Sequence, residues 1–177
     1  MKRTLSILRH AKAADAEAYA TDAERPLTSR GREDAARLGA YLAQHRMLPE
    51  LILCSSATRT RETLAQLGAI IPTILADKLY LASAGEMLAY VQQADDTAQH
   101  IMIIGHNPGM HELVVRLMDD AKDEQDIKRL ALKFPTCAYA RLSFTLDTWN
   151  EMRLNSGLLE TYLIGKELPA TQPSKIA

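Results

Sequence analysis

Arginine and histidine side chains follow three separate apolar runs of this sequence. Arg9 and His10 come directly after "LSIL", Arg59 comes shortly after "LILC", and His106 follows "IMIIG". A guanidinium can bind two phosphate oxygens at once and stays charged at any working pH. An imidazole nitrogen can attack phosphorus or hold charge on a transferring phosphoryl group. These residue types predict a phosphate pocket, provided that the fold brings them together.

The elements around these residues alternate between strand-like apolar runs and helix-like segments. The predicted strands are Thr4–Leu8, Leu51–Cys54, Ile70–Leu75, His100–Ile104, Ala138–Leu146 and Leu158–Ile164. The predicted helices are Ser29–His45, Ala57–Leu67, Gly85–Gln93, Pro108–Met118 and Asp123–Leu130. This alternation indicates an α/β fold, a three-layer sandwich in which helices flank a mainly parallel sheet. The last two strands have no helix between them and are expected to form an antiparallel edge.

Parallel strands present their carboxyl ends at one end of a sheet, where open α/β proteins bind ligands. Arg9, His10, Arg59 and His106 therefore converge if their strands are parallel. On the helix after the second strand, Arg59 and Arg61 are about 200° apart, so that one of them can face the site and the other solvent. With four such groups to supply positive charge, the site needs no metal ion, and we expect no cofactor.

Residues that favour helix starts occur where these helices are expected to begin. Thr28 and Ser56 are placed to cap the first two helices. Asn107 is a favourable cap, and Pro108 suits the first helical position after it. His106 is therefore expected at a strand end, next to a helix N-terminus that adds backbone donors for an anion.

Bulk composition places limits on the function. The 177 residues have a formal net charge of −1, 47% hydrophobic and 24% charged residues, as in ordinary globular proteins. This balance gives no general attraction to nucleic acid or to anionic membranes, and no apolar run is long enough to span a bilayer. We expect one domain over residues 1–168, a loosely ordered tail over 169–177 and a cytoplasmic location.

Cys54 suggests a competing mechanism, because cysteine-dependent phosphatases place five residues between the nucleophilic cysteine and an arginine. Here only four residues separate Cys54 from Arg59. Cys54 also ends an apolar strand, where a small buried cysteine is common. We therefore expect Cys54 to be structural, and Cys137 likewise.

Five segments together resemble the histidine phosphatase superfamily, which has the phosphoglycerate-mutase-like fold, and within it the short SixA-type phosphohistidine phosphatases. The segments are Leu8–Lys12 ("LRHAK"), Asp22–Arg32 ("DAERPLTSRGR"), Ser55–Thr63 ("SSATRTRET"), Ile104–Gly109 ("IGHNPG") and Phe134–Thr136 ("FPT"), the last followed by a strand and Trp149. Their order and spacing carry the resemblance, which covers the chain from Met1 to about Leu168.

The resemblance implies that His10 is the phosphorylated nucleophile and that Arg9, Arg59 and His106 complete the phosphate pocket. The superfamily's Arg-His-Gly reads Arg-His-Ala here, as is familiar in the SixA-like branch. Lys12 either adds charge at the rim or is a solvated lysine. Asp22 and Arg25 either shape the rim or anchor their loop to a helix.

Many superfamily members protonate the leaving group with a carboxylic acid from the segment after the third strand. Glu86 is the candidate here, although a glutamate in the first turn of a helix is favourable without any catalytic role. Imidazole leaves more readily than an alkoxide, so a weak or absent acid favours a phosphohistidine substrate.

The short segment between Arg59 and His106 leaves the pocket uncovered, which would admit a phosphohistidine on another protein. Three functions therefore stay open. The first is hydrolysis of phosphohistidine on a phosphotransfer domain or phosphocarrier protein, with inorganic phosphate as product. The second is hydrolysis of small phosphomonoesters with the same nucleophile. The third is phosphate-dependent binding without turnover.

Overall fold

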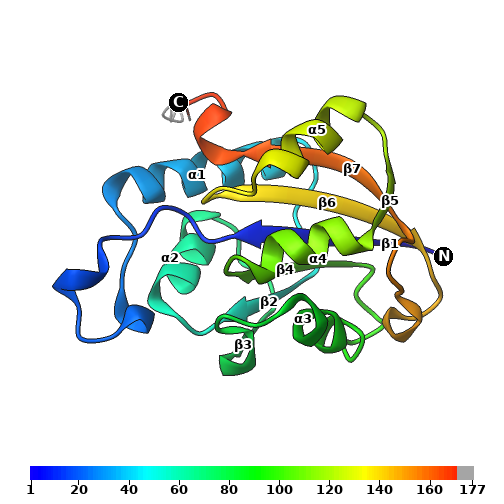
Figure 1. Ribbon diagram of the computed structural model, residues 1–177, viewed down its shortest axis with the longest axis horizontal. Coiled ribbons are helices and arrows are strands. Elements are labelled where there is room, and N and C mark those ends of the chain that lie inside the picture. Colours follow the sequence, from blue (N-terminus) through cyan, green and yellow to red (C-terminus); the bar gives the residue numbers. More distant parts are fainter. Residues whose placement is uncertain (171–177) are drawn as a thin grey trace.

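One mixed sheet forms the centre of the fold in the computed structural model, which describes residues 1–170 (Figure 1). Its strands are β1 (Lys2–Arg9), β2 (Leu51–Ser55), β3 (Thr73–Ala76), β4 (His100–Gly105), β5 (Met118–Ala121), β6 (Ala138–Thr145) and β7 (Gly157–Ile164). The α-helices are α1 (Ser29–Gln44), α2 (Thr58–Gln66), α3 (Ala84–Val91), α4 (Gly109–Leu117) and α5 (Glu124–Leu132). Short 3₁₀ turns are η1 (Ala16–Ala18), η2 (Asp22–Glu24), η3 (Asp77–Leu79), η4 (Trp149–Glu151) and η5 (Gly165–Glu167). Residues 171–177, most of the predicted tail, lie outside the described part of the chain.

The strand order is β3-β2-β4-β1-β6-β7-β5. β3, β2, β4 and β1 are mutually parallel, so their carboxyl ends meet at the same end of the sheet. β6 runs antiparallel to β1, and β7 runs antiparallel to β6. The predicted α/β class, with its parallel centre and antiparallel final pair, is confirmed.

Helices cover both faces of the sheet, which makes three layers. Successive residues of β1 point to opposite faces: Ile7 packs in the core under α3, α4 and α5, whereas Leu8 packs in the core under α1 and α2. Both side chains are completely buried. The helical spacing of the apolar residues in α1 is confirmed, since Ala35, Leu38 and Leu42 all lie in the second core.

Two strands differ from the sequence prediction. β5 pairs in parallel with β7 outside the antiparallel pair, and it was not predicted because its exposed aspartates, Asp119 and Asp120, break the apolar pattern of a strand. β3 covers Thr73–Ala76 instead of Ile70–Leu75, and Ile70 is fully exposed. Both lie at the edges of the sheet, where fewer side chains are buried.

The predicted caps of the first two helices had different outcomes. Thr28 caps α1, since its Oγ1 accepts a hydrogen bond from Gly31 N at 3.0 Å. Ser56 does not cap α2, which begins at Thr58; its hydroxyl donates to the carboxylate of Asp77 instead. A serine beside the end of β2 therefore links two neighbouring strand ends.

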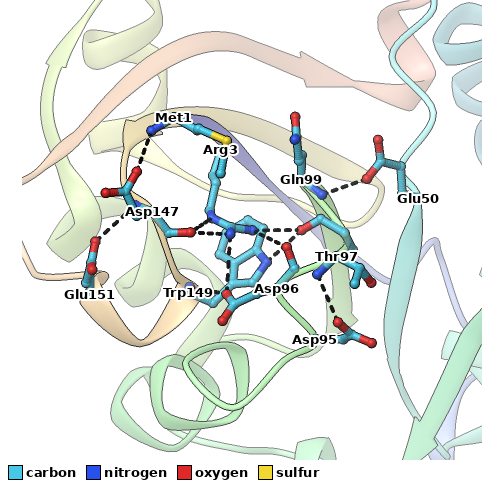
Figure 2. Close-up of polar contacts among 11 residues, drawn as sticks. Met1, Arg3, Glu50, Asp95, Asp96, Thr97, Gln99, Asp147, Trp149 and Glu151 are labelled. Atoms are coloured by element: carbon cyan, nitrogen blue, oxygen red, sulfur yellow. Dashed lines mark hydrogen bonds and ion pairs between the residues drawn. The ribbon is translucent and has the colours of Figure 1, made fainter.

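At the amino end of β1, the buried Arg3 joins three segments of the chain (Figure 2). Its guanidinium donates to the carbonyl oxygens of Asp96 (3.0 Å), Ala98 (3.1 Å) and Asp147 (3.2 Å from Nε). It also lies over the ring of Trp149, with 5.3 Å from Cζ to the ring centroid. These contacts of Arg3 fix the amino end of β1, whereas Arg9 lies at its carboxyl end.

Candidate active site

The pairing of β1 with β4 brings His10 next to His106. Arg9 and Gly105 are partners in the register of these strands, and His10 N donates to Gly105 O at 3.1 Å. The chain then continues from each strand into a histidine. The two imidazole rings lie 5.2 Å apart between centroids and are tilted by 53°.

His10 is buried, and one of its ring nitrogens is held by the backbone. Nδ1 lies 2.8 Å from Ala11 O, which can only accept, so this nitrogen carries the proton and Nε2 keeps the lone pair. Burial, aided by the charges of Arg59 and Arg9 and opposed by the bond to Ala11, lowers the pKa of His10 to about 4. The ring is therefore neutral at pH 7, with Nε2 available for attack on phosphorus.

His106 is also buried and has one unsatisfied ring nitrogen. Its Nε2 is 2.8 Å from the hydroxyl of Ser55, at the end of β2. Its Nδ1 is buried and has no hydrogen-bond partner within residues 1–170. Burial and the neighbouring charges of His10 and Arg59 lower its pKa to about 3. When Ser55 donates to Nε2, the proton lies on Nδ1 and can be donated to an anion.

The two arginines reach this end of the sheet from β1 and α2. Arg9 Nη1 donates to Phe134 O at 3.0 Å, whereas its buried Nε has no partner among the described residues. Burial and the charge of Arg59 lower the pKa of Arg9. The unsatisfied donor and the mutual repulsion of the two guanidiniums would both be relieved by a bound anion.

α2 presents Arg59 to the site and Arg61 to solvent, as its helical spacing predicted. Thr63, one turn after Arg59, connects the helix to the segment that orients His10. Its Oγ1 donates to Arg59 O at 2.7 Å and accepts from Ala11 N at 3.0 Å. Because Ala11 O in turn accepts from His10, α2 helps to fix the orientation of the imidazole.

Asp22 lies directly against Arg59. The Arg59 guanidinium donates to the Asp22 carboxylate at 2.8 Å and to its carbonyl oxygen at 2.5 Å. The same carboxylate accepts from Tyr80 OH at 2.7 Å and from Arg25 Nη1 at 2.6 Å. These bonds, led by that from Tyr80, hold the pKa of Asp22 far below its usual range. Asp22 therefore both contacts Arg59 of the candidate site and ties its loop to α2, and Arg25 Nε donates to Ala14 O at 2.8 Å.

Tyr80 belongs to this site and was missed by the sequence analysis. The Tyr80 ring meets the His106 ring edge-on, with 5.3 Å between their centroids. Arg59 Cζ lies 5.8 Å from the centroid of the Tyr80 ring. It follows η3, directly after the carboxyl end of β3. The position of this segment after a parallel strand was the available signal, although a tyrosine is not among the residue types expected to act as the acid there.

Glu86 and Lys12 lie further from the chemistry. The Glu86 carboxylate accepts from Ser83 N (2.8 Å) and Ser83 Oγ (2.7 Å), which forms the N-terminal capping box of α3. Its side chain is exposed, and the bonds to Ser83 lower its pKa. Lys12 is exposed, and its carbonyl oxygen accepts from Thr28 N at 2.9 Å. The structure thus brings Arg9, His10, Arg59 and His106 together, whereas the Lys12 side chain is exposed.

Asn107 does not cap α4, contrary to the sequence prediction. The N-cap of that helix is Pro108, and the helix begins at Gly109. The Asn107 side chain turns away from the helix, and its Nδ2 donates to Phe134 O at 2.8 Å. This carbonyl also accepts from Arg9, so the turn after β4 and the arginine share one anchor.

The cysteines have the properties of structural residues. Burial raises the pKa of Cys54 to about 12 and that of Cys137 to about 12. Cys54 Sγ donates to Ser55 O at 3.3 Å. A thiolate is therefore unfavourable at either position, which argues against cysteine as the nucleophile.

Residues 1–170 hold neither a group of metal-binding side chains nor a membrane-spanning helix. Within residues 1–170, no group of three or more histidine, cysteine, aspartate or glutamate side chains is arranged to hold a metal ion. In the same part of the chain, no helix combines the length and apolar character that crossing a bilayer requires.

Comparison with known proteins identifies similar sequences and folds. Residues 5–88 match the model of the histidine phosphatase superfamily, branch 1. An uncharacterised protein of Mycobacterium tuberculosis is 34% identical over 136 residues, which are 76% of this chain and 85% of that protein.

Two solved structures extend the similarity. One from Nakamurella multipartitia has a TM-score of 0.81 and 27% identity, covering 92% of this chain and 96% of its own. One from Agrobacterium tumefaciens has a TM-score of 0.71 and 31% identity, covering 79% of this chain and 91% of its own. Both of those proteins are described as candidate SixA phosphohistidine phosphatases.

Proposed function

Because this chain belongs to the histidine phosphatase superfamily and resembles its SixA-type members, we propose that it hydrolyses phosphohistidine on a partner protein, with His10 as the nucleophile. In this proposal Arg9, Arg59 and His106 bind the phosphoryl group, and no metal ion takes part. Lys12 adds positive charge at the rim. The partner is a phosphotransfer domain or a phosphocarrier protein, and inorganic phosphate is the product.

The hydrogen bonds that the Asp22 carboxylate accepts from Tyr80, Arg25 and Arg59 are the observation that carries the choice of substrate. Hydrolysis of a phosphomonoester needs an acid that protonates the leaving alkoxide. Asp22 is the carboxylate in contact with Arg59, and its bonds to Tyr80, Arg25 and Arg59 keep it from holding a proton. Glu86 is likewise held as an anion by Ser83. We therefore do not assign Glu86 as a general acid.

Phosphohistidine needs no such acid when its second ring nitrogen is protonated. His10 Nε2 attacks phosphorus, the P–N bond to the substrate breaks, and its electron pair stays on the leaving nitrogen. The leaving imidazole is then neutral, because it keeps the proton on its other nitrogen. His10 acquires the phosphoryl group and keeps its own proton on Nδ1, where Ala11 O accepts it.

The second step regenerates the enzyme. Water attacks phosphorus, the bond to His10 Nε2 breaks, and dihydrogen phosphate leaves with both protons of the water. Neither step needs a proton from a protein acid. During both steps Arg9, Arg59 and the Nδ1 proton of His106 stabilise the charge on the phosphoryl oxygens.

A comparison of substrates and a trapping experiment test this function. We expect kcat/KM for a phosphohistidine protein to exceed that for sugar and nucleotide phosphates by at least about a hundredfold, a difference of about 3 kcal/mol in barrier. A substrate labelled with ³²P should transfer its label to the enzyme, and His10→Ala should abolish both the label and the turnover. EDTA should leave the rate unchanged.

Three outcomes would contradict the proposal. A higher kcat/KM for small phosphomonoesters would favour the second function, particularly if Glu86→Gln lost that activity. Phosphate-dependent binding without turnover would favour the third. Inactivation by EDTA, or full activity of His10→Ala, would exclude the mechanism.

A further inference from the structure

A groove of about 340 Å³ lies beside the candidate active site. It is lined by Lys12, Arg30, Asp34, Pro135, Thr136 and Lys166. These residues come from the segment after β1, from α1, from the segment before β6 and from η5. Of these residues, only Lys12 has a part in the phosphate chemistry proposed above.

Backbone contacts connect this groove directly to the nucleophile. Cys137 N, next to the Thr136 wall, donates to His10 O at 3.0 Å. On the other side of Pro135, Phe134 O accepts from Arg9. The segment that contains Pro135 and Thr136 is therefore hydrogen-bonded to His10 at one end and to Arg9 at the other. A chain lying in the groove would reach the mouth of the pocket.

The groove is positively charged. Lys12, Arg30 and Lys166 are exposed, and none of them forms an ion pair with another residue of the described chain. Arg30 lies in the first turn of the 16-residue helix α1, whose N-terminus adds positive potential. Among the described residues that line the groove, Asp34 is the one carboxylate, and it is buried.

The cations are held close together by the fold. Thr28 N and Oγ1 both donate to Lys12 O, at 2.9 and 3.1 Å, which fixes Lys12 beside the start of α1. η5, which carries Lys166, packs against α1 (Figure 1). Because the whole chain has a formal net charge of −1, this positive charge is a local feature.

We propose that this groove docks an acidic segment of the protein that carries the phosphohistidine. The inference rests on the proposed function and adds to it a preference for acidic residues near the phosphorylated histidine. Exposed cations at the rim of a site attract and orient an oppositely charged partner, so they act mainly on the association rate. Pro135 and Thr136 offer a wall against which a peptide backbone can lie.

Three synthetic peptides of equal length test the proposal. Each contains one phosphohistidine, flanked by aspartate and glutamate, by serine and alanine, or by lysine. At low salt, we expect the enzyme to hydrolyse the acidic peptide with a kcat/KM about tenfold above that for the basic peptide. The ratio should fall towards one as salt is added, because salt screens exposed charges.

Charge reversal at two positions identifies the surface responsible. The double variant Arg30→Glu and Lys166→Glu should lose the preference for the acidic peptide or reverse it. Hydrolysis of phosphoramidate, which is too small to reach the groove, should stay within about twofold and shows that the variant is folded. The matched control, Arg61→Glu with Lys128→Glu, makes the same change at exposed positions outside the groove and should keep the preference.

The possible results separate the two proposals. If the groove variant keeps the preference, or if the control loses it equally, docking in the groove is overturned and the proposed function stands. If the enzyme hydrolyses phosphomonoesters but none of the three peptides, the proposed function fails and the docking proposal fails with it.

Discussion

At the scale of single residues, the site combines positively charged and neutral groups. His10 and His106 are neutral, Arg9 and Arg59 repel each other, and buried nitrogens of Arg9 and His106 have no partner among the described residues. Within residues 1–170, Asp22 is the one anion in contact with the pocket arginines. Its carboxylate lies where it competes with an incoming phosphate for Arg59.

This competition leads to a prediction for Asp22→Asn. Removal of the negative charge should tighten the binding of inorganic phosphate or tungstate by about fivefold, which corresponds to about 1 kcal/mol for a partly exposed ion pair. Inhibition constants at constant ionic strength measure the effect. Glu24→Gln is the control, since it removes a carboxylate of the same turn that bonds to Thr21 instead of Arg59. Weaker anion binding in Asp22→Asn would mean that Asp22 positions Arg59.

At the scale of elements, the helix α2 does more than carry Arg59. Thr63 joins the helix to Ala11, and Ala11 O holds the tautomer of His10. The carbonyl oxygen of Phe134 also connects separate segments, because it accepts hydrogen bonds from both Arg9 and Asn107. The strand ends are therefore fixed to one another by the segments that follow them.

Thr63→Val tests this connection, because valine has nearly the same shape but no hydroxyl. Ala11 N would lose its acceptor in a buried place, which should cost about 1–3 kcal/mol of unfolding free energy. Since the carbonyl that orients His10 would shift, kcat should fall more than KM rises. Denaturant unfolding and steady-state kinetics measure the two effects, with the exposed Thr145→Val as control. Unchanged kcat would show that Thr63 has no role in orienting His10.

Arg3→Met separates stability from activity at the other end of β1. The variant removes the donor to the carbonyl oxygens of Asp96 and Asp147, in a place where Arg3 is buried, whereas Ala98 O keeps its bond from Trp149 Nε1 at 2.8 Å. We expect a loss of roughly 2–4 kcal/mol in unfolding free energy. The kcat/KM of the folded protein should be unchanged. Urea unfolding measures the change in stability, and kinetics at temperatures below the unfolding transition measure kcat/KM. A large loss of kcat/KM would show that the contacts of Arg3 affect the site.

The sequence predicted the centre of the fold better than its edges, for a physical reason. β1, β2 and β4 are apolar because both faces of the sheet are covered there, and the ends of these strands located Arg9, His10, Arg59 and His106. β5 and β3 were missed or displaced because their edge positions leave side chains exposed. Tyr80 and the contact of Asp22 with Arg59 depend on how η2 and η3 fold over the site, and local sequence does not encode that arrangement.

At the scale of the whole molecule, burial of uncharged histidines links stability to pH. Burial is the main cause that lowers the pKa of His10 to about 4, His106 to about 3 and His100 to about 4. An unfolded chain would protonate each of them near 6.5. Between these values the unfolded state binds more protons, so stability is greatest above pH 6.5 and falls as the pH falls towards 4.

We therefore expect each of these histidines to cost roughly 1–2 kcal/mol of unfolding free energy between pH 6.5 and pH 5. Phosphate should reduce the loss, because an anion between the imidazoles and the arginines favours the protonated rings. Thermal or urea unfolding at both pH values, in phosphate and in chloride of equal ionic strength, makes the comparison. Equal stability at the two pH values in chloride would contradict the burial of neutral histidines.

In the proposed mechanism, the contact of 2.8 Å between His10 Nδ1 and Ala11 O also determines which ring nitrogen carries the phosphoryl group in the intermediate. Phosphohistidine exists as two isomers, which carry the phosphoryl group on one ring nitrogen or the other. Because Nδ1 is turned towards a carbonyl oxygen, only Nε2 can accept the group. The phosphorylated enzyme should therefore be a single regioisomer, which reagents specific for the Nε2 form recognise and reagents specific for the Nδ1 form do not.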